Sequence, residues 1–281
     1  MNIINCKPIR EKILAEVRDA GYKGLKLVII RVGDDPASGI YVRNKVKTAE
    51  SVGIITEVVK CDERIPGQDL KAIIASRAAD PSVTCIILQL PLPSHLQQYE
   101  RDLIDLIPPD KDVDGLTTAN IGRLWANKPC IVPATPGGIL RLLPEDLSEK
   151  NVTIINRSAL IGKPLAKLLM DRNATVTVCH SKTHWSCLRD FAKYADYVVS
   201  AIGKANYFGD SYFADYTTWI DCGINRENGQ LFGDVEPILM DRFEIDLTPV
   251  PGGVGILTTA QLMANIVKAH ELQKGLYHAE N

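Results

Sequence analysis

Short apolar runs alternate with segments of helical periodicity along most of the chain. The run LKLVIIRV at residues 25–32 is apolar enough for a strand covered on both faces, as parallel sheets require. Predicted strands cover residues 25–32, 54–59, 84–88, 152–155, 174–178, 197–201 and 218–221. Predicted helices cover residues 8–20, 38–52, 67–79, 99–106, 139–143, about 162–171 and 259–274. This alternation indicates an α/β fold with parallel strands and right-handed crossovers.

Residues 151–183 read as strand, tight turn, helix and strand, the size of a dinucleotide-binding βαβ unit. The turn is N-x-S-x-x-x-G rather than G-x-G-x-x-G. We expect Asn156 to adopt the positive φ that glycine usually supplies, since Asn tolerates that region best after Gly. Ser158 is small enough to let a pyrophosphate approach the helix N-terminus, and Gly162 allows close helix–strand packing. The alternative is a packing turn of any α/β protein.

The end of the second strand of this unit indicates which dinucleotide would bind. NAD-binding folds place a carboxylate about 20 residues after the glycine turn, where it holds the ribose 2′-OH. Residues 179–183, CHSKT, contain no carboxylate. Their hydroxyls and lysine, together with Arg157 of the turn, suit a 2′-phosphate. The predicted cofactor is therefore NADP rather than NAD.

Composition excludes several classes of protein. The 281 residues suffice for two domains, and the formal net charge of −2 argues against nucleic-acid binding through bulk electrostatics. No apolar stretch reaches about 18 residues, and the start lacks the pattern of a signal peptide. The seven cysteines contain no C-x-x-C pair and do not cluster with the histidines. We therefore expect a cytoplasmic protein with reduced thiols, no metal site, and no nucleic-acid or membrane partner.

Candidate chemistry in the first half of the chain lies near the carboxyl ends of predicted strands, where open parallel sheets bind ligands. Gln89 directly follows a strand, and Asp114 lies in a polar loop after a helix. Tyr41 and Lys45 are four residues apart on a helix, so their side chains point the same way. A ring and an ammonium group at that spacing could hold a flat aromatic ligand and handle a proton. The alternative is an ordinary surface helix.

Seven motifs together resemble one family, the bifunctional methylenetetrahydrofolate dehydrogenase/methenyltetrahydrofolate cyclohydrolases, over about residues 36–265. They are Y-V-R-N-K-V-K-x-x-E-x-V-G-I (41–54), I-L-Q-L-P-L-P (87–93), P-x-K-D-V-D-G (109–115), P-A-T-P (133–136), N-R-S-x-x-I-G-K-P-L-A (156–166), A-T-V-T-V-C-H-S-K-T (174–183) and T-P-V-P-G-G-V-G (248–255). The resemblance implies an N-terminal α/β folate domain, a Rossmann-like NADP-binding domain with a parallel sheet, and a cleft between them. It places residues 1–135 and the last helix, 259–281, in the folate domain and residues 136–258 in the NADP-binding domain. It also implies a homodimer formed through the cofactor domain.

The resemblance also implies roles for individual residues. Lys45 corresponds to the catalytic lysine and Gln89 to its partner, while Asp114 matches the carboxylate that binds the pterin edge. Tyr41 matches the ring that stacks on the folate. The remaining folate-site residues that it implies are Ser38, Pro251, Gly252 and Gly255. The cofactor-binding residues that it implies are Asn156, Arg157, Ser158, Gly162, Ser181, Thr183 and Ile224.

The implied reactions are consistent with these residue types. A hydride first passes from the methylene bridge of 5,10-methylenetetrahydrofolate to NADP, and because nitrogen lone pairs stabilise the resulting cation, positioning does most of the work. Water then adds to the 5,10-methenyl cation, and the ring opens to 10-formyltetrahydrofolate. This second step needs proton transfer, and desolvation beside a cation favours the neutral form of a lysine such as Lys45.

The chain departs from the usual family pattern at three places. Asn156 replaces the usual glycine of the turn, Ala134 stands where cysteine is more frequent, and Ile256-Leu257 replace Pro-Met. None of these changes removes a reacting group. Two alternatives stay open: a dehydrogenase-only enzyme of the same fold, and a non-catalytic folate-binding protein.

Overall fold

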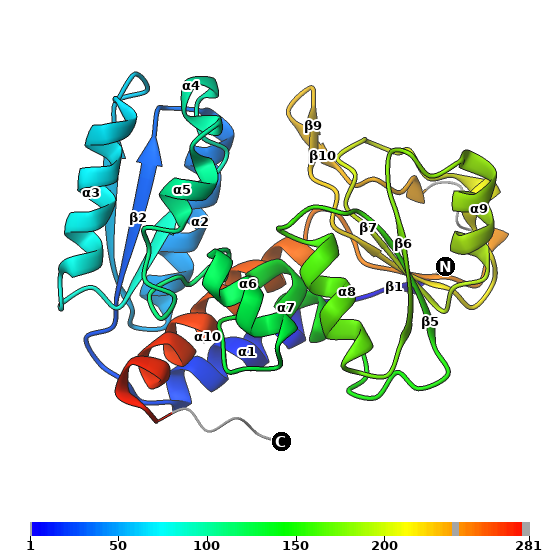
Figure 1. Cartoon of the computed structure of the whole chain (residues 1–281). Helices are drawn as coiled ribbons and strands as arrows, with labels where there is room; N and C mark the ends of the chain where they lie inside the picture. Colours follow the sequence, from blue (N-terminus) through cyan, green and yellow to red (C-terminus); the bar gives the residue numbers. More distant parts are fainter. Residues whose placement is uncertain (1, 238–241, 277–281) are drawn as a thin grey trace. The chain divides into compact units, whose positions relative to one another are not determined.

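The structure, a computed structural model, describes residues 2–237 and 242–276 (Figure 1). The chain divides into two compact units. The first unit comprises Lys12–Ala134 and the chain from Thr259, and the second comprises Thr135–Thr258 and the segment that ends at Glu11.

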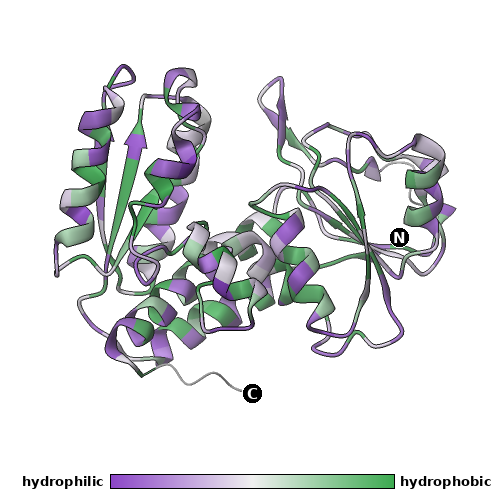
Figure 2. Cartoon of the chain, viewed as in Figure 1, coloured by the Kyte–Doolittle hydropathy of each residue, from purple (hydrophilic) through white to green (hydrophobic). Residues whose placement is uncertain are grey.

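The first unit contains a three-stranded parallel sheet. Its strands are β2 (Lys26–Val32), β3 (Ile55–Cys61) and β4 (Cys85–Leu88), in the order β3-β2-β4. The central strand β2 is apolar along most of its length (Figure 2) and buried from Leu27 to Val32. As the pattern predicts, a nearly continuous apolar run forms a strand in a parallel sheet. Because β2 pairs with β3 on one side and β4 on the other, the ends of β2 and β4 are fixed. Helix α2 follows β2, and Gln89 follows β4.

Helices follow the strands of the first unit. They are α2 (Pro36–Ser51), α3 (Gly67–Ala79), α4 (Ser94–Gln97), α5 (Glu100–Ile104) and α6 (Thr118–Trp125). Two further helices, α1 (Lys7–Asp19) and α10 (Val254–Lys274), cross the division between the units. Leu70 and Ile74 of α3 pack into one buried cluster with Val28 and Ile30 of β2. Burial of these side chains, each worth about 1.5–3 kcal/mol, anchors the sheet of this unit.

The second unit has a six-stranded parallel sheet in the order β1-β11-β8-β7-β5-β6. Its strands are β1 (Asn2–Ile3), β5 (Asn151–Ile155), β6 (Thr175–Cys179), β7 (Tyr197–Ser200), β8 (Thr218–Asp221) and β11 (Asp246–Leu247). An antiparallel pair, β9 (Asn225–Glu227) and β10 (Gln230–Phe232), follows β8. Its helices are α7 (Ala134–Leu140), α8 (Gly162–Met170), α9 (Trp185–Lys193) and the 3-10 helix η1 (Asp210–Tyr212). This is a Rossmann-like arrangement, as expected.

Both faces of the second sheet are covered. Ile154 of β5 packs with Leu165 of α8 in one buried cluster, while the next residue, Ile155, packs with Leu188 of α9 in another. Successive strand residues point to opposite faces, so α8 and α9 cover different faces of β5. Trp219 of β8 is fully buried in the second of these clusters.

The N-terminal segment belongs to a different unit from the one predicted. The sequence-based boundaries put residues 1–135 together, whereas the segment up to Glu11 groups with the second unit. The cause is long-range pairing, because Asn2 and Ile3 lie opposite Asp246 and Leu247 in that sheet. A two-residue strand has no periodicity to detect, so the pattern could not predict it.

Several local predictions also differ from the structure. The pattern did not predict α4, α6, α9, β9, β10 or β11. α10 begins at Val254 rather than at residue 259, which places Gly255 inside the helix. On α8, Leu165 is buried, whereas the apolar Met170 is 45% exposed. Lys167 is buried there instead, because its ammonium group pairs with Asp171.

Asn265 of α10 fixes the loop that carries Asp114. The Asn265 side chain is 1% exposed and donates to the backbone oxygens of Val113, at 2.9 Å, and Val132, at 2.8 Å. Gly115 closes the same loop with a φ of 68°, and a Cβ there would lie 2.7 Å from the carbonyl oxygen of Ile131. Asn265 of α10 therefore holds the backbone of Val113, the residue directly before Asp114.

We expect Asn265→Ala to lower the free energy of unfolding by about 2–4 kcal/mol. The substitution leaves two buried carbonyl oxygens without these donors, and each such loss costs about 1–3 kcal/mol. Urea unfolding followed by circular dichroism measures the change. Lys274→Ala, at the exposed end of the same helix, is the matched control and should leave the midpoint unchanged. A wild-type unfolding midpoint for Asn265→Ala would contradict the role of Asn265 in fixing this loop.

Candidate active site

Lys45 and Gln89 are joined by a hydrogen bond. The Nζ of Lys45, on α2, donates to the Oε1 of Gln89 at 3.1 Å, and both side chains are half-buried. The Nε2 of Gln89 donates to the backbone oxygen of Leu90 at 2.6 Å, which turns its Oε1 toward the lysine. The backbone N–H of Gln89 donates to Ile30 at 2.8 Å, so Gln89 continues the pairing of β4 with β2. The lysine is thereby held by a group whose own position is fixed by the sheet.

Helix α2 places three predicted residues along one side. Ser38, Tyr41 and Lys45 follow one another at intervals of three and four residues, which face the same way on a helix. Ser38 is buried, whereas Tyr41 is 40% exposed. Tyr41 therefore presents accessible ring surface one turn before the lysine.

The start of α2 is fixed by two groups that the sequence did not single out. The carboxylate of Asp35 accepts a hydrogen bond from the backbone N–H of Ser38 at 2.7 Å and caps the helix. Arg31 of β2 is only 8% exposed and donates from Nη2 to the backbone oxygen of Asp35 at 2.8 Å. An N-cap aspartate before proline is a detectable signal, but an arginine inside an apolar strand gives no indication of its partner.

Asp114 lies in the loop between α5 and α6 of the same unit and is half-buried. Its neighbour Asp112 is 2% exposed and accepts from the backbone N–H of Thr117 at 2.7 Å and from Nδ2 of Asn120 at 3.0 Å. Burial raises the pKa of Asp112, while these hydrogen bonds oppose that rise. Asp112 thus holds the loop together, and Asp114 is the more accessible carboxylate of the two.

In the second unit, the turn after β5 does not use the backbone conformation that the sequence suggested. Asn156 is not among the described residues with a positive φ. Its side chain shapes the turn instead: Oδ1 accepts from the backbone N–H groups of Ser158, at 2.8 Å, and Gly162, at 3.0 Å. Its Nδ2 donates to the backbone oxygen of Ala201 at 2.6 Å, after β7. The side-chain amide of Asn156 therefore makes three hydrogen bonds that a glycine, which has no side chain, could not make.

Gly162 packs against this turn. A Cβ at Gly162 would overlap the carbonyl oxygen of Asn156, so the first residue of α8 has to be glycine for the helix to approach β5 this closely. Ser158 accepts from the backbone N–H of Ile161 at 3.1 Å, and Arg157 is exposed. The N–H of Gly162 is bonded to Asn156 and that of Lys163 to the backbone oxygen of Ser158, so the exposed Arg157 is the group of this turn that can bind a phosphate.

The loop after β6 lies next to this turn, because β5 and β6 are neighbours and parallel. The hydroxyl of Thr183 accepts from the backbone N–H of His180 at 2.9 Å, and this bond closes the loop. Ser181 and Lys182 are exposed at its tip. Thr183 therefore shapes the loop, while Ser181 and Lys182 are accessible to an anion.

The predicted residues at the end of the unit gather near the carboxyl end of β8. Ile224, 45% exposed, follows β8, and a Cβ on Gly255 would lie 4.0 Å from its Cδ1. Pro251 is exposed, and Gly252 has a φ of 101°, a conformation that favours glycine. The structure thus brings Ile224 and Gly255 together within the second unit.

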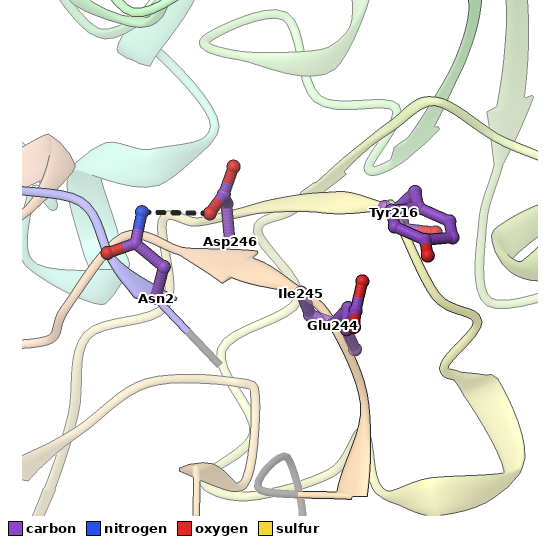
Figure 3. A pocket seen from close by; sticks show the side chains of 6 residues that line it. Asn2, Tyr216, Glu244, Ile245 and Asp246 are labelled. Carbon is purple, nitrogen blue, oxygen red and sulfur yellow. Dashed lines mark hydrogen bonds between the residues drawn. The ribbon is translucent and has the colours of Figure 1, made fainter.

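A pocket of the second unit lies at the opposite ends of its strands. Its lining residues are Asn2, Tyr216, Thr217, Glu244, Ile245 and Asp246 (Figure 3), which sit at the amino ends of β8 and β11 or beside them. Asn2 donates from Nδ2 to Asp246 at 3.0 Å, and this bond helps to hold β1 against β11. Parallel sheets bind ligands beyond the carboxyl ends of their strands, so we do not assign this pocket to the active site.

Among residues 2–237 and 242–276, no group of three or more His, Cys, Asp or Glu side chains is arranged to hold a metal ion. No helix in the described part of the chain combines the length and apolar character that a membrane crossing requires.

Comparisons with known proteins identify the family of the chain. A family model described as tetrahydrofolate dehydrogenase/cyclohydrolase, catalytic domain, matches residues 4–114, and one described as tetrahydrofolate dehydrogenase/cyclohydrolase, NAD(P)-binding domain, matches residues 133–274. The bifunctional protein FolD of Streptococcus pneumoniae is 44% identical over 247 residues, which cover 86% of this chain and 85% of that protein.

Solved structures extend the likeness to the fold. The bifunctional 5,10-methylenetetrahydrofolate dehydrogenase/cyclohydrolase of Thermoplasma acidophilum is 34% identical, with a TM-score of 0.89 over 98% of this chain and all of that one. The methylenetetrahydrofolate dehydrogenase-cyclohydrolase of Trypanosoma brucei, complexed with NADP cofactor and inhibitor, is 29% identical, with a TM-score of 0.88 over 97% of this chain and 98% of that one. The chain therefore belongs to the tetrahydrofolate dehydrogenase/cyclohydrolase family, the bifunctional FolD enzymes of one-carbon folate metabolism.

Proposed function

We propose that this chain oxidises 5,10-methylenetetrahydrofolate to 5,10-methenyltetrahydrofolate with NADP and then hydrolyses the product to 10-formyltetrahydrofolate. The observation that carries the proposal is the hydrogen bond between Lys45 and Gln89, because it supplies an oriented proton-transfer group beside an accessible ring. A dehydrogenase-only enzyme would not need that lysine.

For the dehydrogenase step, the first unit binds and orients the folate. Tyr41 stacks on its aromatic ring, Asp114 binds the amino-pyrimidine edge of the pterin, and Ser38 contributes to the site wall. A dinucleotide held by the second unit would supply the hydride acceptor, and the two folate nitrogens stabilise the cation that remains on the folate. Because no proton moves in this step, positioning of the reacting carbon within about 3–3.5 Å of the acceptor is the main requirement.

The cyclohydrolase step uses Lys45. Water adds to the methenyl carbon and gives up a proton. The hydroxyl of this adduct then loses its own proton as the formyl C=O forms, and a ring nitrogen takes up a proton as its bond to that carbon breaks, so one proton is released overall. Lys45 moves protons between these positions as a general acid and base. Gln89 orients the amine through an uncharged oxygen, so it adds no negative charge that would hold the proton on the lysine.

The second unit fits a dinucleotide. The side chain of Asn156 shapes the turn before α8, and the missing Cβ of Gly162 lets the helix begin close to β5. Arg157 and Ser181 are exposed at the ends of neighbouring strands, where they can bind a 2′-phosphate. The loop that would hold a 2′-hydroxyl in an NAD-binding fold has no carboxylate at residues 179–183. These features support NADP as the cofactor.

A homodimer through the second unit and a cytoplasmic location complete the proposal. Strand β6 is an edge of the six-stranded sheet, and its Val178 is 40% exposed. An edge strand with an exposed apolar side chain is a surface that a second copy can cover. All seven cysteines are free thiols, which agrees with a reducing compartment.

Lys45→Met tests the proton-transfer role. The variant keeps the apolar stem and removes the amine, so we expect cyclohydrolase turnover to fall by about 10²–10⁴-fold, the usual contribution of a positioned acid–base group. The decay of methenyltetrahydrofolate absorbance measures it, and some loss of dehydrogenase activity is compatible with altered positioning. Lys47→Met, exposed on the same helix, is the matched control. Full hydrolysis by Lys45→Met would remove this residue from the mechanism.

Arg157→Ala tests the choice of cofactor. Loss of a charge-assisted hydrogen bond to a 2′-phosphate costs about 1.5–3 kcal/mol, so the KM for NADP should rise about 10- to 100-fold. The KM for NAD should change little, since NAD lacks that phosphate. Steady-state dehydrogenase assays with each dinucleotide measure both values, and Lys193→Ala, at an exposed position of α9, is the control. An equal rise for NAD and NADP would contradict recognition of the 2′-phosphate by Arg157.

Val178→Lys tests the proposed dimer. A buried lysine at the edge of β6 would oppose the association of two copies, so we expect a monomer in size-exclusion chromatography with light scattering. Ile55→Lys is the matched control, because Ile55 is 54% exposed on β3, an edge strand of the first unit. A dimer that survives Val178→Lys but not Ile55→Lys would place the interface on the first unit instead.

A further inference from the structure

Two buried carboxylates of the second unit have no place in the chemistry above. Asp221 is the last residue of β8 and is 3% exposed. Asp234 follows β10 and is fully buried. Burying a carboxylate is costly unless hydrogen bonds compensate for the lost water, so their partners show what the burial achieves.

Asp234 connects the segments that follow two neighbouring strands. Its Oδ2 accepts from the hydroxyl of Ser200, at 2.7 Å, and from the backbone N–H of Ile202, at 2.6 Å. Its Oδ1 accepts from the backbone N–H of Lys204, at 3.0 Å, and from Nδ2 of Asn225, at 3.2 Å. The loop after β7 is thereby tied to the start of β9, which follows the loop after β8.

Asp221 completes the connection. Its Oδ1 accepts from the backbone N–H groups of Gly223, at 2.8 Å, and Asp234, at 3.0 Å, and its Oδ2 accepts from that of Val235 at 2.9 Å. Burial raises the pKa of Asp221 to about 6 despite these bonds. Within the described part of the chain, the hydrogen-bond partners of the two carboxylates are uncharged donors, and most are backbone N–H groups of irregular segments.

The surrounding glycines leave room for the two side chains. A Cβ at Gly223 would overlap the carboxylate of Asp234, and one at Gly233 would overlap that of Asp221. Glycine is therefore required at both positions by the presence of a carboxylate, not by backbone conformation alone.

The position of these loops in the sheet indicates what they support. The chain runs from β5 outward to β6 and then returns to β7 on the other side of β5. That reversal is the point where a doubly wound sheet binds a dinucleotide across its carboxyl ends. The phosphate-binding turn follows β5, so the other half of the dinucleotide lies toward the loops after β7 and β8. Ile224 lies in the second of these loops, between Gly223 and Asn225.

We propose that Asp221 and Asp234 are positioning residues that fix the loops after β7 and β8 as the support for the nicotinamide end of the dinucleotide. The inference rests on the proposed function. The two carboxylates act on hydride transfer through Ile224 and its neighbours, and they have no part in hydrolysis of the methenyl group. The bifunctional enzyme thus contains its own control, because the cyclohydrolase reaction consumes no dinucleotide.

Asp234→Asn is the principal test. The amide that replaces one carboxylate oxygen turns a donor toward the donors Ser200 and Ile202, or toward Lys204 and Asn225, so the connection is broken while side-chain size is kept. We expect the KM for NADP to rise at least about tenfold and the dehydrogenase kcat to fall, as for loss of a buried charged hydrogen bond. Cyclohydrolase kcat and KM, measured on methenyltetrahydrofolate without NADP, should remain at wild-type values.

Two further measurements guard against loss of folding. Near-ultraviolet circular dichroism reports on Trp219, which is buried in the second unit. If Asp234→Asn loses that signal, Ser200→Ala tests the same connection by removing one neutral donor, and we expect a smaller rise, about three- to tenfold, in the KM for NADP. Thr153→Ala is the matched control for Ser200→Ala, since its buried hydroxyl donates to Phe191 within the same sheet and away from these loops.

The outcomes separate the two proposals. A folded Asp234→Asn with an unchanged KM and kcat for the dehydrogenase, or a parallel loss of both activities, would overturn the positioning role. A wild-type enzyme without cyclohydrolase activity would overturn the proposed function instead.

Discussion

The hydrogen bond between Lys45 and Gln89 joins a helix to the end of a strand, and the proposed chemistry depends on it. A lysine on a helix surface has many accessible rotamers, and a mobile amine is a poor acid or base catalyst. The sheet removes that freedom, since the backbone of Gln89 is bonded to β2 and its side chain to Leu90. Because the amide is neutral, orientation is obtained without a countercharge. Gln89 thus meets two requirements: it holds the amine of Lys45 in place, and it leaves the proton of that amine transferable.

The second unit solves a comparable problem with a side-chain amide. In dinucleotide-binding folds, glycines usually allow the path of the turn that leads from the first strand into the helix. In this chain Asn156 accepts from two N–H groups of the turn and donates to the loop after β7. The replacement of a glycine therefore adds a link between two loops at the switch point of the sheet. Close packing is left to Gly162, where a side chain has no room.

Buried carboxylates stabilise the loops of both units. Asp112 holds the loop that carries Asp114, and Asp221 and Asp234 hold the loops that carry Ile224. In each case the carboxylate accepts from neutral donors that an irregular segment would otherwise leave unsatisfied. An irregular loop at a strand end can thereby be as well fixed as the strand itself, which suits a site that works by positioning.

The sequence by itself determined the strands and helices with strong periodicity, the α/β class and the family, because those signals are local or are carried by contiguous motifs. It also picked out Lys45 and Gln89 separately, since one follows a tyrosine by a helical turn and the other ends an apolar run. The family resemblance implied that they are partners, and the structure contains the hydrogen bond between them. Only the tertiary structure decided that Asn156 acts through its side chain and that residues 2–3 pair with residues 246–247. The same holds for the network around Asp221 and Asp234. Apart from the local bonds of Asn156 to Ser158 and Gly162, these features depend on contacts between segments that are not adjacent in the chain, and such contacts leave no periodic or compositional trace in either segment alone.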